Sequence, residues 1–81
     1  MKQTKQSLQD YVLNALRKSA MSASIIVTNG FQLNDVKVCA FDNFVVVVQN
    51  SDRQMMIYKH AISSIIPSGD LNLDFSEREQ V

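Results

Sequence analysis

The chain has 81 residues, 46% of them hydrophobic, and carries no formal net charge. This length allows one small domain with a modest core. Cys39 is the only cysteine and His60 the only histidine, which excludes an intrachain disulfide and an ordinary four-ligand zinc site. Oligomerisation is therefore the expected support for a chain this small.

The absence of net charge hides an uneven distribution along the chain. Residues 1–20 carry a charge of +3, residues 21–69 carry 0, and residues 70–81 carry −3. A polyanionic partner is therefore compatible with the sequence. The first residues lack the apolar segment of a secretory signal, and no apolar run is long enough to span a bilayer. We expect a cytoplasmic protein without a membrane partner.

The chain is predicted to open with a disordered segment, residues 1–6, followed by a helix. Ser7 is a suitable N-cap, and Asp10 stands at the acidic position of a capping box. Apolar residues then recur at helical spacing and predict one inward-facing stripe. Its members are Leu8, Tyr11, Val12, Ala15, Leu16 and Ala20.

Five short strands are predicted after the helix. The β-branched residues 25–28 favour a strand, and Asn29-Gly30 is a two-residue hairpin signal. The other strands are predicted at residues 31–40, 44–48, 54–59 and 62–66, with turns at 41–43 and 50–53 and a stop at Pro67. The four valines of the third strand indicate burial on both of its faces.

The second strand is predicted to alternate between two faces. The members of these faces are Val36, Val38 and Ala40 on one side and Lys37, Cys39 and Phe41 on the other. Cys39 is expected to be a small buried hydrophobe.

One helix followed by five antiparallel strands predicts a mainly β protein, a small barrel. The outer strands of such a barrel have unpaired edges, which a closed ring of copies would satisfy. Residues 68–81 show few turn or periodicity signals, so a flexible acidic tail is expected there.

No catalytic or metal-binding set is visible in the sequence. There is no nucleophile motif around any serine and no spacing typical of metal ligands, and two glycines are too few for a phosphate-binding loop. We therefore expect neither an enzyme nor a cofactor.

The triplet Tyr58-Lys59-His60 interrupts an otherwise apolar segment and has two readings. In the first, Lys59 protects an edge strand from aggregation and His60 lies in a turn. In the second, the triplet forms part of a pocket for a nucleic-acid base, with an aromatic ring such as Phe44 as the stacking platform. The triplet taken alone leaves both readings open.

Four segments in this order resemble Hfq, a family of bacterial Sm-like RNA chaperones. They are residues 7–10 with 13–18, residues 29–33, residues 41–44 and residues 57–63. The resemblance covers residues 7–67 and implies an N-terminal α-helix on a strongly bent five-stranded antiparallel barrel of the Sm-like (SH3-like) class. It also implies a homohexameric ring in which the fourth and fifth strands of neighbouring copies pair.

The resemblance further implies an RNA chaperone that binds small regulatory RNAs and mRNAs and promotes their pairing in post-transcriptional regulation. The residues implied for uridine-rich RNA on the proximal face are Gln9, Asp10, Asn43, Phe44, Tyr58, Lys59 and His60. Those implied for annealing on the rim are Asn14, Arg17, Lys18 and Phe41. Those implied for adenine-rich RNA on the distal face are Ile26, Gly30, Phe31, Leu33, Asn34, Gln54 and Ser64.

The second strand departs from the family pattern. Asp35 stands where the family has a glycine, and one extra residue separates Leu33 from Phe41. An inserted residue reverses the side-chain alternation unless a bulge absorbs it. We therefore predict a bulge between residues 34 and 40.

Two further departures concern the RNA surfaces. Ile26 replaces a frequent aromatic residue, so adenine stacking on the distal face would rely more on Phe31. The rim has Arg17-Lys18 rather than a longer arginine patch, and lysine lacks the planar guanidinium fork. Weaker annealing than in the most basic family members is expected.

The sequence leaves two alternatives open. The main expectation is an RNA chaperone. The alternative is a ring that mainly scaffolds protein and RNA, and the neutral net charge and the changes in the second strand are the features that support it. The acidic tail either solubilises the protein or competes with RNA for the basic rim.

Overall fold

The computed structural model describes residues 7–73. The expectation of a disordered start falls on residues 1–6, which lie outside this range, as do residues 74–81 of the expected tail. Just after the last strand, the backbone N–H of Ser68 donates to Ser22 O at 3.0 Å, and Leu71 packs against the core.

Helix α1 spans Leu8–Ser19 and begins at the predicted cap. The backbone N–H of Asp10 donates to Ser7 Oγ at 3.1 Å. The helix buries Leu13 and Leu16, whereas Leu8 is 52% exposed and Ala20 is exposed. The predicted stripe was therefore wrong at both ends, because the packed face follows Leu13 and Leu16. No helix within residues 7–73 combines the length and apolar character needed to cross a membrane.

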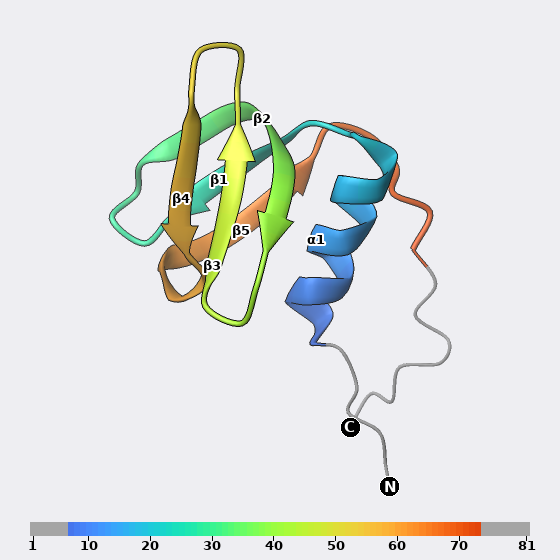
Figure 1. Ribbon diagram of the computed structural model, residues 1–81, viewed down its shortest axis with the longest axis horizontal. Helices are drawn as coiled ribbons and strands as arrows, with labels where there is room; N and C mark the ends of the chain where they lie inside the picture. Colours follow the sequence, from blue (N-terminus) through green and yellow to red (C-terminus); the bar gives the residue numbers. More distant parts are fainter. Residues whose placement is uncertain (1–6, 74–81) are drawn as a thin grey trace, which may run out of the picture.

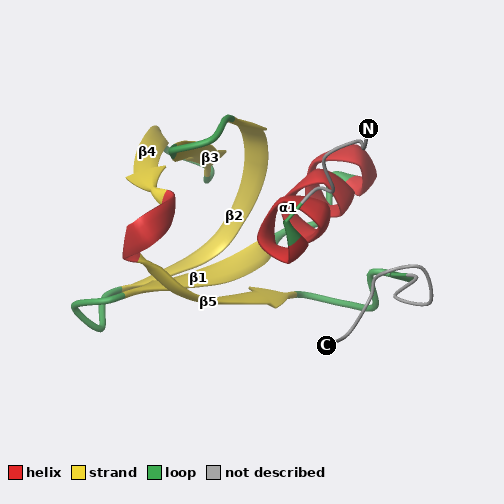
Figure 2. Cartoon of the chain, turned by 90° about the horizontal axis from the view of Figure 1, so that it is seen from below, coloured by secondary structure: helices red, strands yellow, loops and turns green. Residues whose placement is uncertain are grey.

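The strands form one five-stranded antiparallel sheet, which confirms the predicted fold class. They are β1 (Ala23–Val27), β2 (Gln32–Phe41), β3 (Val45–Gln49), β4 (Gln54–Tyr58) and β5 (Ile62–Pro67), in the order β4-β3-β2-β1-β5. A 3₁₀ turn, Lys59–Ala61, joins β4 to β5. β2 is long and strongly curved, so it belongs to both halves of the sheet, and α1 lies beside it (Figures 1 and 2).

The curvature of β2 coincides with two irregularities in its pairing. Ile25 pairs with Leu33 but Ala23 pairs with Val36, so β2 carries one extra residue there. Within that stretch Asp35 has a φ of 58°, the left-handed conformation. A second shift lies between Val38 and Ala40, opposite β3. The predicted bulge between residues 34 and 40 is confirmed, and it occurs twice.

The second bulge overturns two predictions for β2. Val36 and Val38 are buried as expected, but Ala40 is exposed and Phe41 is half-buried against the core. The extra residue at Cys39 reverses the alternation, because two residues of β2 oppose one of β3. Cys39 is exposed rather than buried, because it shares the outer face of β2 with the exposed Lys37.

The β1–β2 connection is a hairpin, but its loop is longer than predicted. Val27 N donates to Phe31 O at 2.9 Å, and Gly30 N donates to Val27 O at 2.8 Å. Gly30 has a φ of 90°, and it alone among residues 28–30 has a positive φ. A two-residue type I′ turn requires two positive φ values, so the chain forms a three-residue loop that ends at glycine.

The core lies between the two halves of the sheet and α1. Its buried residues are Leu13, Leu16, Ala23, Ile25, Val36, Val38, Val46, Val48 and Ile57. Val46 and Val48 are fully buried, but Val45 and Val47 are only half-buried, so β3 is fully covered on one face alone. The edge strands β4 and β5 expose large apolar side chains, namely Met56, Tyr58 and Ile66.

Candidate nucleic-acid interface

The loop between β2 and β3 is built around the carboxylate of Asp42. Its Oδ1 accepts hydrogen bonds from the backbone N–H groups of Phe44, at 2.8 Å, and Val45, at 2.9 Å. These donors hold the pKa of the Asp42 carboxyl below its ordinary value of 3.8, and the nearby charge of Lys59 adds to the effect. The loop displays the Phe44 ring, which is 65% exposed.

The 3₁₀ turn after β4 lies against this loop. The backbone N–H of Lys59 donates to Phe44 O at 2.8 Å, so the two residues are fixed side by side. Tyr58, which pairs with Val45 across the strands, is 68% exposed. Two aromatic side chains are thus exposed next to a lysine and a histidine.

The lysine of this turn is held by two other parts of the chain. Lys59 Nζ forms an ion pair and a hydrogen bond with Asp10 Oδ1 in the first turn of α1. The same Nζ lies 5.1 Å from the centroid of the Phe41 ring, within the range of a cation–π contact. The Lys59 side chain is only 9% exposed, so its charge is held at the base of the site.

The first turn of α1, the β2–β3 loop and the 3₁₀ turn enclose a hollow of about 560 Å³. Its lining residues are Ser7, Gln9, Asp10, Asn43, Lys59, His60 and Ile62. Five of the seven residues predicted for the proximal face therefore come together here. Phe44 and Tyr58 do not line the hollow. Ser7 and Ile62 were missed, because the sequence marks them as a cap and a strand residue.

The residues predicted for the rim lie along α1 and the end of β2. Arg17 and Lys18 are exposed, and Arg17 Nη2 donates to Asn14 Oδ1 at 2.6 Å. Arg17 and Phe41 line one shallow hollow, and Asn14 and Lys18 line another. The structure thus places the four rim residues around α1 without joining them in one pocket.

The residues predicted for the distal face are divided between the two halves of the sheet. Ile26 pairs with Ser64 on β5, and Phe31, beside Gly30, is 62% exposed. Leu33 is half-buried and packs against the core. Asn34 is exposed, and its Oδ1 accepts from Ser24 Oγ at 3.0 Å and Gln32 Nε2 at 2.7 Å. Gln54 lies apart from these residues, on β4.

An N-terminal helix on a bent five-stranded antiparallel sheet, with both outer strands open, defines an Sm-like domain. A model of the Hfq protein family matches residues 8–72. The chain belongs to the Hfq family.

Named relatives and a solved structure agree with this assignment. The chain is 48% identical to the RNA-binding protein Hfq of Moorella thermoacetica, over 99% of this chain and 94% of that protein. It is 44% identical to the RNA-binding protein Hfq of Desulforamulus reducens, over 93% and 92% of the two chains. A crystal structure of the pleiotropic translational regulator Hfq superposes with a TM-score of 0.71 at 27% identity, covering 82% of this chain and 98% of that one.

Proposed function

We propose that this protein is an RNA chaperone that binds small regulatory RNAs and mRNAs as single strands and promotes their pairing. The observation that carries the proposal is the hollow between α1 and the 3₁₀ turn, with the exposed Phe44 ring beside it. Amide, imidazole and ammonium groups converge there and suit a base edge and a phosphate, and the ring offers a stacking surface. Such binding makes and breaks no covalent bond. The proposed location of the protein is the cytoplasm, where these RNAs act.

The Sm-like domain proposed for this activity is residues 7–67, and the proposed assembly is a homohexameric ring. Support for a ring comes from β4 and β5, which are both edge strands and expose Met56, Tyr58 and Ile66. Pairing of β4 with β5 of the next copy would cover these side chains and leave no open edge. It would also bring Gln54 of one copy toward the β5 strand of its neighbour, which carries Ser64.

A ring strengthens binding without stronger individual contacts. One base stacked on an aromatic ring contributes only about 1–3 kcal/mol. Repeated sites that engage one strand raise the overall affinity through effective concentration. Two RNAs held on one ring also meet more often, and the exposed Arg17 and Lys18 reduce the repulsion between their phosphates.

The two aromatic platforms provide a reciprocal test of the proposal. We expect Phe44→Ala to weaken binding of oligouridine by about tenfold and to leave oligoadenine binding nearly unchanged, because each stack contributes about 1–3 kcal/mol. Phe31→Ala is the matched control and should do the reverse. Fluorescence anisotropy with both oligonucleotides measures these changes. Equal losses for both oligonucleotides in both variants would contradict two separate base-binding surfaces.

One observation favours the second candidate, a ring that mainly scaffolds protein and RNA. The ion pair between Asp10 and Lys59 already neutralises the lysine of the hollow. RNA must then compete with Asp10 for this cation. The salt dependence of oligouridine binding separates the candidates, since phosphate contacts make affinity fall as salt rises. Absent or salt-insensitive binding would favour the scaffold.

A further inference from the structure

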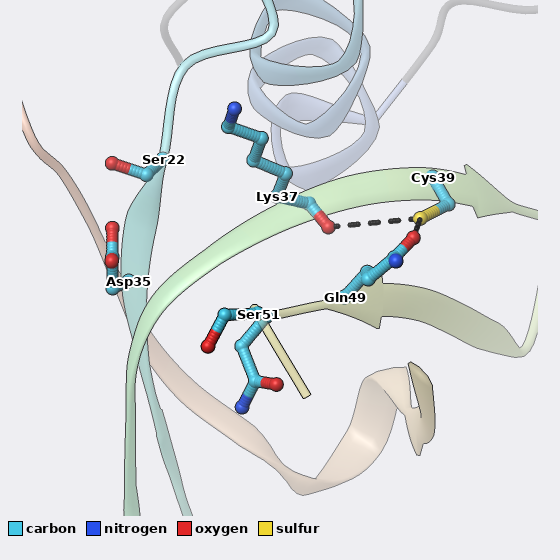
Figure 3. Close-up of a pocket in the computed structure, with 7 residues that line it drawn as sticks. Ser22, Asp35, Lys37, Cys39, Gln49 and Ser51 are labelled. Carbon is cyan, nitrogen blue, oxygen red and sulfur yellow. Dashed lines mark hydrogen bonds between the residues drawn. The ribbon is translucent and has the colours of Figure 1, made fainter. Parts of the chain in front are cut away.

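A polar groove lies on the outer surface of β2 and β3 and adjoins the predicted rim surface. It has a volume of about 670 Å³ and is lined by Ser22, Asp35, Lys37, Cys39, Gln49, Asn50 and Ser51 (Figure 3). Lys37 and Gln49 are direct partners across the two strands, so their side chains share one face of the sheet. None of these seven residues belongs to the surfaces implied by the family resemblance.

Two amide side chains of the groove have NH₂ groups left to donate. Asn50 Oδ1 is occupied by the backbone N–H groups of Asp52, at 2.8 Å, and Arg53, at 3.0 Å. Because both partners are donors, the Asn50 oxygen must face them, which leaves its NH₂ group for a ligand. Gln49 Oε1 likewise accepts from Cys39 Sγ at 3.7 Å, which leaves the Gln49 NH₂ group.

The charges of the groove are separated along its length. Asp35 lies beside Ser22, at the end away from Cys39 and Gln49 (Figure 3). Lys37 is exposed, and the Asp10–Lys59 contact is the sole ion pair found within residues 7–73, so Lys37 has no ionic partner there. The Lys37 ammonium extends toward α1, away from the Gln49 amide (Figure 3), so the cation and the amide donors are spread along the groove and suit the successive phosphates of a polyanion.

The groove continues the rim surface. Cys39 lines both the groove and the shallow hollow formed by Arg17, Ala40 and Phe41. A strand of RNA that crosses Arg17 and Phe41 can therefore continue over Cys39 to Lys37 without leaving the surface. β2 and β3 are internal strands, so pairing of neighbouring copies through β4 and β5 does not use their edges.

We propose that the groove formed by Lys37, Gln49 and Asn50 binds the phosphodiester backbone of single-stranded RNA that extends outward from the rim. The inference rests on the proposed RNA-binding function and adds a site to it. Lys37 supplies the charge that attracts one phosphate, and the two amide groups donate to oxygens of neighbouring phosphates or riboses. The site holds extended RNAs on the ring and does not select a base.

The test compares a short oligouridine with the same oligouridine extended by an unstructured single-stranded tail. We expect Lys37→Ala to weaken binding of the extended RNA by about threefold. It should also reduce the steepness with which the logarithm of the affinity falls against the logarithm of the salt concentration, by about 0.7 for each Lys37 engaged. Binding of the short oligouridine should not change. Asn50→Asp keeps the acceptor that the turn requires but replaces the NH₂ group with a charged oxygen, so it should weaken the extended RNA similarly.

Arg53→Ala is the matched control, because it also removes one exposed cation but lies outside the groove and the three predicted surfaces. A loss confined to the extended RNA, seen in the two groove variants and absent from Arg53→Ala, supports the proposal. Unchanged binding of the extended RNA in the groove variants, or an equal loss in Arg53→Ala, overturns the groove and leaves the proposed function standing. If the unmodified protein binds neither RNA, the proposed function itself fails and the groove with it.

Discussion

Asp42 shows how one side chain shapes the candidate site. Its carboxylate accepts two backbone hydrogen bonds and so fixes the loop that displays Phe44. The sequence predicts a turn at residues 41–43, but the loop lies one residue later, at 42–44, because Asp42 bonds the backbone N–H groups two and three residues ahead. The contact of Asp10 with Lys59 has no such local signal, since 49 positions separate the two residues.

The lowered pKa of Asp42 gives a pH dependence with a definite sign. The carboxyl has a lower pKa in the folded chain than in the unfolded one, so its contribution to stability is complete above the ordinary value of 3.8. The contribution is lost as the pH falls through the lowered folded value. Asp42→Ala should therefore lower the free energy of unfolding, measured in urea, most strongly at neutral pH. This deficit should shrink under acidic conditions. Asp42→Asn, which keeps an acceptor oxygen, is the control. A deficit that does not change with pH would contradict this role.

At the scale of elements, β2 decides the shape of the domain. Its existence and its bulge could be predicted, because β-branched residues mark the strand and the extra residue must be absorbed. The second irregularity, at Cys39, could not be predicted, because alternation over residues 36–40 reads as a regular strand. The pairing with β3 determines where the alternation reverses, and this is tertiary information. The same limit explains why the predicted inward stripe of α1 was wrong at both ends.

The conformation of Asp35 makes a prediction for this strand. A left-handed backbone costs a residue other than glycine about 1–2 kcal/mol, and aspartate somewhat less. Asp35→Gly should therefore raise the free energy of unfolding by about 0.5 kcal/mol, whereas Asp35→Val should lower it by about 1 kcal/mol. Lys37→Gly, in the same strand but with a negative φ, should be destabilising. Urea titrations measure all three, and a destabilising Asp35→Gly would show that the strain at this bulge is negligible.

At the scale of the whole molecule, the open edges and the proposed RNA site are linked. The 3₁₀ turn that carries Lys59 and His60 also connects the two edge strands, β4 and β5. Amino-acid patterns and the family resemblance predicted this association of site and edge. The hollow itself could not be derived from local patterns, because it joins the first turn of α1 to two distant loops. Only the folded chain brings Gln9 to His60.

The mass of the assembly with bound oligouridine tests the central claim most directly. Native mass spectrometry of the full chain should give a ring of six copies that retains oligouridine, because closing the β4 and β5 edges creates repeated sites for one strand. A charged substitution on an edge strand, Met56→Asp, should reduce both the ring and the retained RNA. A protein that remains monomeric and retains no oligouridine would contradict the account.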